Sequence, residues 1–254
     1  MLETVARFLG KKKRGQAGET VYHRAMLCRV LPSFGLILLC SGSSTLAADP
    51  SSAVNPKDGW KLATDAKDVI IFSRPHAESN LKEFKAIGTI DAPSSAVGAV
   101  IDDFENYPKF MPYTSECRLI KREGDSVIGY QRVSPKICED RDYTLRVLKK
   151  SSSGPKGLTY SSQWQTANEL GPPERKGVVR LKVCNGSWLL EPDGPTRTRA
   201  TYSVYSETGG FIPPFIANHA SITGIKKLYE AIRKQAKEPK YAAAASAAAA
   251  PAKP

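Results

Sequence analysis

The sequence is poor in the residues that bind metals or attack substrates. Only three histidines occur in 254 residues, and neither His76 nor His219 has a cysteine or a second histidine at ligand spacing, so no metal site is predicted. The sequence also lacks a Gly-x-Ser-x-Gly nucleophile elbow, a P-loop and the glycine fingerprint of dinucleotide-binding domains. These absences predict a protein that is not an enzyme and that needs no cofactor.

Cysteine is scarce as well. Of the five cysteines, Cys117, Cys138 and Cys184 lie beyond the N-terminal region. An odd number allows at most one internal disulfide and leaves at least one thiol free. The sequence leaves the disulfide open, and small buried side chains are the simpler interpretation of all three.

No apolar run is long enough for a comfortable transmembrane helix. The run Val30–Cys40 follows a short basic stretch and precedes small residues that end at Ala47 and Ala48. This order is typical of a secretory signal peptide. We therefore expect residues 1–47 to be a targeting segment cleaved near Ala47 or Ala48, and the protein to be exported to a bacterial periplasm.

The same region leaves two alternatives open. Met26 alone would begin an ordinary signal peptide, so the chain starts either at Met1 or at Met26. Cys40 is a candidate for lipidation, but Leu39 stands before it, where lipoprotein signals carry a small residue.

Basic residues outnumber acidic ones. The chain carries a formal net charge of +12, and removal of residues 1–47 takes away seven basic and two acidic residues, which leaves +7. The basic residues are scattered rather than massed in one segment, which argues against nucleic acid as a partner. A moderate excess favours transient contact with an anionic membrane surface, although a solvated basic surface explains it equally well.

After a polar leader at residues 48–56, the pattern predicts one domain over residues 57–237. Apolar residues at helical spacing predict helices at Ala92–Glu105 and Pro213–Lys237. Segments bounded by turn residues predict strands at Val69–Ser73, Leu81–Ile90, Glu116–Lys121, Ser126–Val133, Arg141–Lys149, Gly157–Thr166, Gly177–Leu190 and Thr198–Ser206. Successive strands with tight turns favour an antiparallel meander, and the whole pattern favours an α+β fold. The Ala-, Pro- and Lys-rich residues 238–254 predict a disordered tail.

Two motifs stand about 70 residues apart. The first, Glu139-Asp140-Arg141-Asp142-Tyr143, begins a predicted strand. The second, Gly209-Gly210-Phe211-Ile212-Pro213-Pro214-Phe215-Ile216-Ala217-Asn218, opens the last predicted helix; its glycines permit a turn with positive φ, and its prolines suit a first helical turn. With these motifs, residues 58–237 resemble the START (steroidogenic acute regulatory protein-related lipid transfer) domain family.

The resemblance implies a helix-grip fold, in which a curved antiparallel sheet wraps around a long C-terminal helix. It implies a lipid-binding or lipid-transfer protein that holds one hydrophobic small molecule in a cavity, with the last helix and the loop Gly209–Pro214 as the gate. The candidate cavity and gate residues are Arg141, Asp142, Trp164, Trp188, Phe211, Phe215, Asn218 and Ile222.

Two alternatives accompany this interpretation. Arg141 and Asp142 also fit a structural role at the start of a strand, because a neighbouring cation keeps carboxylates ionised. A related branch of cyclases and aromatases uses the same cavity, which implies an enzyme acting on a polyketide or aromatic substrate.

Overall fold

The computed structural model describes residues 54–66, 68–77, 79–136 and 138–243. The predicted targeting segment, residues 48–53 of the leader and residues 244–254 of the predicted tail lie outside the described residues.

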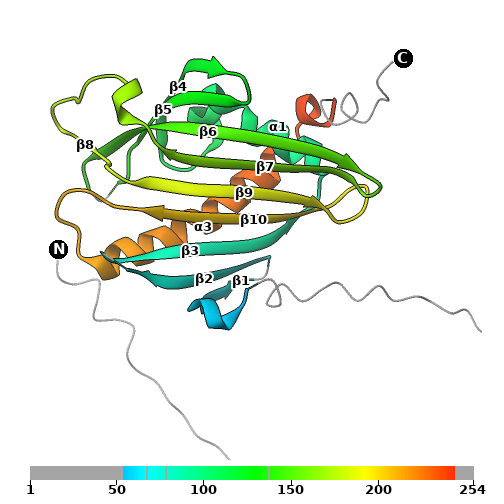
Figure 1. The fold of residues 1–254 in the computed structure, drawn as a ribbon, viewed down its shortest axis with the longest axis horizontal. Coiled ribbons are helices and arrows are strands. Elements are labelled where there is room, and N and C mark those ends of the chain that lie inside the picture. Colours follow the sequence, from blue (N-terminus) through cyan, green and yellow to red (C-terminus); the bar gives the residue numbers. More distant parts are fainter. Residues whose placement is uncertain (1–53, 67, 78, 137, 244–254) are drawn as a thin grey trace, which may run out of the picture. The chain divides into compact units, whose positions relative to one another are not determined.

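Ten strands form a single sheet (Figure 1), and nine of them follow the order β1-β2-β3-β10-β9-β7-β6-β5-β4 with antiparallel neighbours. The remaining strand, β8, pairs with β6 in parallel. The bounds are β1 (Lys61–Ala66), β2 (Val69–His76), β3 (Ser79–Ile90), β4 (Thr114–Glu123), β5 (Ser126–Val133), β6 (Asp140–Gly154), β7 (Gly157–Thr166), β8 (Val178–Arg180), β9 (Cys184–Pro192) and β10 (Thr198–Ser206).

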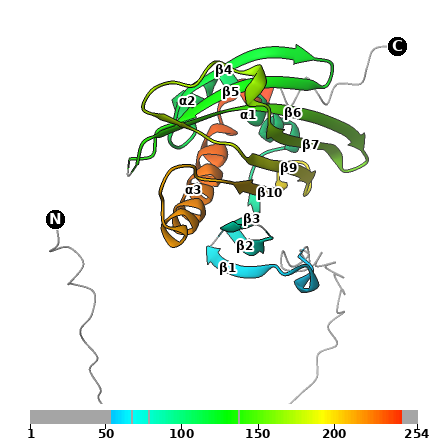
Figure 2. The ribbon, with the colours of Figure 1, turned by 60° about the vertical axis from the view of Figure 1, so that its left-hand side comes forward.

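Helical segments connect distant strands of the sheet and cover one of its sides. The segment α1 (Ser94–Asp102), η3 (Phe104–Asn106) and α2 (Tyr107–Phe110) carries the chain from β3 to β4 at the opposite edge. From β4 the strands return across the sheet until β10 pairs with β3. The last helix, α3 (Pro214–Gln235), lies along one side of the sheet, which curves around it (Figures 1 and 2). Two further short helices are η2 (Pro56–Asp58) and η4 (Asn168–Leu170).

A tyrosine on α3 anchors this helix to the centre of the sheet. Tyr229 is fully buried, and its hydroxyl lies 3.0 Å from the carbonyl oxygen of Ala86 on β3 and 2.9 Å from that of Ala200 on β10. Gly88 makes room for the ring, because a Cβ atom there would stand 2.8 Å from it. The predicted helix-grip fold is therefore confirmed, and this contact is what docks the helix.

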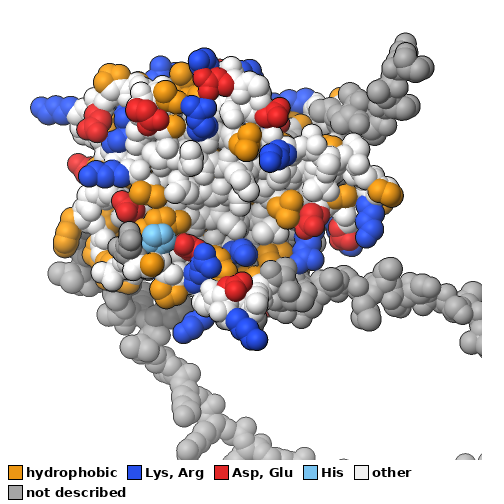
Figure 3. Space-filling view, in the orientation of Figure 1, with side chains coloured by type: hydrophobic (Ala, Val, Ile, Leu, Met, Phe, Trp, Pro, Cys, Tyr) orange, Lys and Arg blue, Asp and Glu red, His pale blue; other side chains and the backbone are white. Residues whose placement is uncertain are grey.

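The other side of the sheet faces outward. In Figure 3 the middle of this side is covered by uncharged side chains and backbone, and charged side chains gather toward its margins. An alternating strand with one face on the core and one in water produces this arrangement.

The predicted elements differ from the observed ones in a few places. The segment predicted as one strand, Gly177–Leu190, is two strands, β8 and β9, because β8 turns aside to pair with β6. Ser151–Ser153 lies outside the predicted strands, but it continues β6 opposite β7. β1 was missed, since its residues are largely exposed and carry little apolar pattern.

The ordered chain continues past the predicted domain end. Residues 239–243 form a helical turn, and Tyr241 is 3% exposed within the main core cluster. Its hydroxyl and the Lys240 ammonium both bind the Asp103 carboxylate, at 2.7 and 2.6 Å. Residues 239–243 of the predicted tail are therefore helical, with Tyr241 packed in the core, and its aromatic side chain is the feature that the Ala-rich composition hid.

The described cysteines, Cys117, Cys138 and Cys184, are all free thiols. Burial raises the pKa of the Cys184 thiol to about 11, so that it stays protonated at neutral pH. Among the helices that the structure describes, none combines the length and the hydrophobicity needed to cross a membrane.

Candidate functional site: a cavity between the sheet and the last helix

A cavity of about 550 Å³ lies between the sheet and α3. Its walls come from β3 to β7, β9 and β10, from α1 to α3 and from η3. This volume falls in the range of about 300–1,000 Å³ that is usual for small-molecule sites.

Strand alternation decides which side chains reach the cavity. On β5 and β6, Gly129, Gln131, Tyr143 and Leu145 line it. Successive side chains of a strand point to opposite faces, so the residues between them point outward. Tyr143 of the first sequence motif thus belongs to the cavity, a role that the motif itself did not reveal and that this alternation would have indicated.

Aromatic rings form the floor of the cavity. The ring of Tyr202 on β10 lies 4.6 Å from Trp188 and 5.8 Å from Trp164, measured between ring centroids. Trp164 packs over Gly186, where a Cβ atom would stand 2.3 Å from its ring. Two of the candidate residues, Trp164 and Trp188, thus line the cavity.

The last helix, α3, forms the opposite wall. Ser221, Gly224 and Leu228 of α3 line the cavity, and their i, i+3, i+7 spacing places them on one helical face. A Cβ atom on Gly224 would meet nothing within 4 Å. Glycine inside a helix costs about 0.5–1 kcal/mol relative to alanine, so the chain leaves this space open at some expense in stability.

One part of the lining is charged. Asp102, at the end of α1, accepts a hydrogen bond of 2.7 Å from the Tyr160 hydroxyl and pairs with the Lys149 ammonium. Burial, together with the Asp102 carboxylate, raises the pKa of Tyr160. The Asp102 carboxylate and the Lys149 ammonium neutralise each other, so this part of the cavity carries little net charge.

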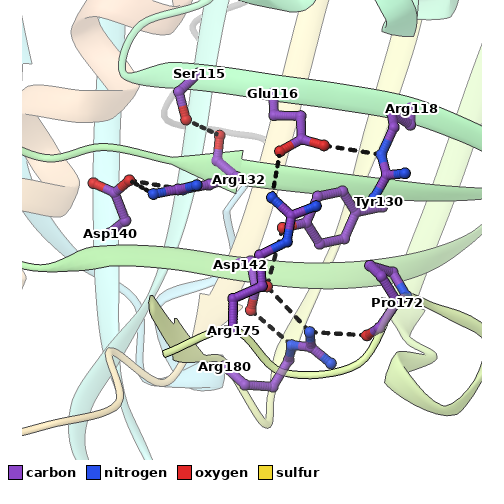
Figure 4. A network of polar contacts seen from close by, with 10 residues as sticks. All are labelled: Ser115, Glu116, Arg118, Tyr130, Arg132, Asp140, Asp142, Pro172, Arg175 and Arg180. Carbon is purple, nitrogen blue, oxygen red and sulfur yellow. Dashed lines mark hydrogen bonds and ion pairs between the residues drawn. The ribbon is translucent and has the colours of Figure 1, made fainter. Parts of the chain in front are cut away.

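The outward residues next to the cavity form a buried polar network (Figure 4). The Arg180 guanidinium donates two hydrogen bonds to Asp142, at 2.6 and 3.1 Å, and the Tyr130 hydroxyl donates a third at 3.0 Å. Asp142 is 1% exposed. Burial, and then the bond to Asp142, raises the pKa of Tyr130 to about 12. Asp142 was a candidate cavity residue, but it is absent from the lining and clamps β8 to β6 on the outward side.

Arg141 joins the two sequence motifs. Its Nε donates to the carbonyl oxygen of Thr208 at 3.2 Å, and a Cβ atom on Gly210 would stand 3.9 Å from its Nη2. Gly209 and Gly210 have φ values of 57° and 62°, the left-handed turn that the sequence predicts. Arg141 therefore holds the turn before α3 and does not line the cavity, which matches the structural alternative.

The remaining candidates lie around the first turns of α3, outside the cavity lining. Phe211 is 98% exposed and Phe215 is 74% exposed. Asn218 accepts a 3.1 Å hydrogen bond from the backbone N–H of Lys82 on β3, and Ile222 packs against the main core cluster. The expectation that Phe215 faces inward is wrong: the buried residues of this helix are Ala217, Ile225, Tyr229 and Ile232, and Phe215 is not among them.

A strained residue stands at the rim of the cavity. Tyr113, between α2 and β4, has a φ of 60°, a value that bulky residues rarely adopt. Its hydroxyl accepts a 2.8 Å hydrogen bond from the Lys227 ammonium on α3, which also lies 4.9 Å from the centre of its ring. This contact ties the rim to the helix.

In the part of the chain that the structure describes, no three His, Cys, Asp or Glu side chains lie together in a way that would hold a metal ion. Apart from its charged residues, the cavity offers aromatic rings, aliphatic side chains and hydroxyls. Such a lining suits a hydrophobic molecule with few polar groups.

The fold and the cavity define a START-like helix-grip protein. A family model described as polyketide cyclase / dehydrase and lipid transport matches residues 90–233, and the chain belongs to this family.

Relatives agree with this class. A STAR-related lipid transfer protein from Xanthomonas axonopodis has a solved structure that covers 71% of this chain and 100% of its own, with 25% identity and a TM-score of 0.63. Human StAR-related lipid transfer protein 5 shares the fold at 20% identity and a TM-score of 0.60, over 70% of this chain and 86% of that one. Mouse phosphatidylcholine transfer protein is 26% identical over 169 residues, which are 65% of this chain and 78% of the relative.

Proposed function

We propose that this protein binds one hydrophobic ligand in the cavity between the sheet and α3 and carries it between membranes. The observation that carries the proposal is the cavity itself, about 550 Å³ in volume, with Trp164, Trp188 and Tyr202 on one wall and the open space at Gly224 on the other. Similarity to proteins named as lipid transfer proteins supports the same function.

Native mass spectrometry of protein purified from its own host tests this proposal. A bound lipid in a one-to-one complex is the expected result. Gly224→Leu, which places a side chain into the open space, should lower lipid occupancy at least tenfold. Ala220→Leu is the matched control, because Ala220 is exposed on the same helix. Equal occupancy in both variants would contradict a ligand site in this cavity.

The exposed aromatic turn before α3 supports membrane contact. Phe211, Phe215 and Ile216 are 98%, 74% and 37% exposed. Lys82, also exposed, lies beside them through its bond to Asn218. Exposed aromatic side chains next to a cation suit the boundary of an anionic bilayer. Opening of the adjacent loop Gly209–Pro214 and of the first turns of α3 would then release the ligand at the membrane.

Export is part of the same proposal. It rests on the signal-like order of residues 26–48 in the sequence. Sequencing the N-terminus of the protein from a periplasmic extract should give a chain that begins at Ala48 or Asp49. A full-length cytosolic protein would contradict it.

An enzyme of the cyclase and aromatase branch is the second candidate. Asp102, Tyr160 and Lys149 favour it, because they bring ionisable groups to the cavity. However, a raised pKa makes Tyr160 a reluctant proton donor, and Asp102 is paired with Lys149. Turnover of an aromatic polyketide by the purified protein, lost in Asp102→Asn, would favour the enzyme over the carrier.

A further inference from the structure

The tyrosines of the cavity divide into two groups. Three of the five that line it have hydroxyls bonded within the protein: Tyr107 to the Ile101 carbonyl at 2.6 Å, Tyr160 to Asp102 and Tyr113 to Lys227. Among the described residues, the hydroxyls of Tyr143 and Tyr202 have no hydrogen-bond partner.

These two hydroxyls are not sealed inside the protein. The fully buried side-chain polar atoms without a partner, within the described ranges, are His76 Nδ1 and Thr144 Oγ1, and neither belongs to the cavity lining. The hydroxyls of Tyr143 and Tyr202 therefore reach the space of the cavity. Polar groups in such surroundings almost always have a partner, and a bound molecule would provide one here.

The surroundings of the two hydroxyls are uncharged. Trp164 and Trp188 flank Tyr202, and the neutral thiol of Cys184 belongs to the same lining. Burial raises the pKa of both Tyr143 and Tyr202, so both remain protonated and can donate as well as accept. Burial of a charged group here would find no counter-ion and would be costly.

The charged side chains of the lining either form ion pairs within the protein or are exposed at the surface. Asp102 is paired with Lys149, and Asp103 is paired with Lys240. The other three, Lys82, Glu105 and Arg122, are exposed. A zwitterionic headgroup would have to break the first pair or remain at the surface.

We propose that Tyr143 and Tyr202 bind an uncharged hydroxyl group of the ligand, and that the ligand is a neutral lipid. This inference rests on the proposed carrier function and narrows it to a class of cargo. The hydroxyls bind the neutral polar group, and the aromatic floor packs against the adjoining hydrocarbon.

Two probes that differ only in their headgroup test the inference. The lipid-free protein is titrated with a diacylglycerol and with a phosphatidylcholine that carry the same fluorescent acyl chain. We expect diacylglycerol to bind at least ten times more tightly. Tyr143→Phe and Tyr202→Phe should each weaken diacylglycerol binding about 3- to 10-fold, as the loss of one hydrogen bond predicts, and should leave phosphatidylcholine binding unchanged.

Tyr205→Phe is the control, since Tyr205 lies on the same strand as Tyr202 but is absent from the cavity lining. Phosphatidylcholine binding as tight as or tighter than diacylglycerol binding in the unmutated protein would overturn the inference and leave the carrier function standing. Equal weakening of both probes in the Phe variants would also overturn it. Failure of the unmutated protein to bind either lipid would instead refute the proposed function.

Discussion

The two halves of α3 sit on the sheet in different ways. In the C-terminal half, Ile225, Tyr229 and Ile232 are at most 4% exposed, and the Tyr229 hydroxyl reaches two strand carbonyls. In the N-terminal half, Phe215 and Ile216 are 74% and 37% exposed, and Ala217 is the buried residue. One continuous helix is therefore anchored in the core by its C-terminal half, whereas its N-terminal half buries few side chains.

This difference indicates which end opens. Regions with few buried apolar contacts open at lower free energy than regions packed in the core. The N-terminal half follows the Gly209–Gly210 turn and also borders the cavity through Ser221 and Gly224. We infer that ligand exchange uses the N-terminal half while Tyr229 keeps the other half in place.

The largest expected effect comes from removing the anchor. Tyr229→Ala deletes a fully buried ring and should lower the free energy of unfolding by about 3–5 kcal/mol. Phe215→Ala, an aromatic truncation on the same helix, should change it by less than about 0.5 kcal/mol. Urea unfolding measures both, and similar losses would break the distinction between the two halves.

A destabilisation outside α3 sharpens the comparison. Asp142→Asn removes the partner of the buried Arg180 and should cost about 3–5 kcal/mol. Because Asp142 lies on the outward side of the sheet, the rate of ligand release from the folded protein should stay within about twofold of the unmutated value. A release rate that rises in proportion to the lost stability would instead show that the cavity opens by global unfolding.

The anchor also predicts a response to alkaline pH. Burial raises the pKa of Tyr229 in the folded protein, whereas the pKa of an unfolded tyrosine is about 10. Above that pH the unfolded chain loses a proton that the folded protein keeps, so stability falls as pH rises. Each such group contributes about 1.4 kcal/mol per pH unit. Tyr229→Phe should reduce the alkaline slope of unfolding free energy by this amount, and an unchanged slope would contradict the burial of this hydroxyl.

A smaller effect of opposite sign is expected at the cavity wall. Gly224→Ala removes a helix-interior glycine without a clash, because a Cβ atom there meets nothing. It should raise the free energy of unfolding by about 0.5–1 kcal/mol. Thermal unfolding of the lipid-free protein measures it, with Ala220→Gly as the reverse substitution on the exposed side. A loss of stability in Gly224→Ala would place the residue in packed surroundings.

The sequence predicted the strand series, the last helix and the left-handed turn, because turn residues and periodicity are local signals. Trp164 and Trp188 line the cavity, and their ligand-binding role stays a prediction, since large aromatic side chains in strands line a filled core as readily as a cavity. The outward position of Asp142 was not predicted, because its partner Arg180 is distant in sequence and is brought to it by the parallel strand β8. Phe215 was assigned to the wrong face, since an apolar stripe near a helix end does not reveal where burial begins.

Phe215→Asp is the substitution with the smallest expected effect on the fold and a distinct effect on function. If Phe215 faced the cavity, a carboxylate there would expel the ligand; at 74% exposure, the charge stays in water and costs little. Lipid occupancy by native mass spectrometry should therefore be unchanged. Transfer of a fluorescent lipid between anionic vesicles should slow several-fold, because the substitution removes an exposed ring that we propose to contact the membrane and adds repulsion from the lipid surface. Leu62→Asp is the matched control, because Leu62 is an apolar residue of β1 that is 61% exposed. Slower transfer in both variants alike would point to general charge repulsion, and loss of bound lipid in Phe215→Asp alone would return this residue to the cavity.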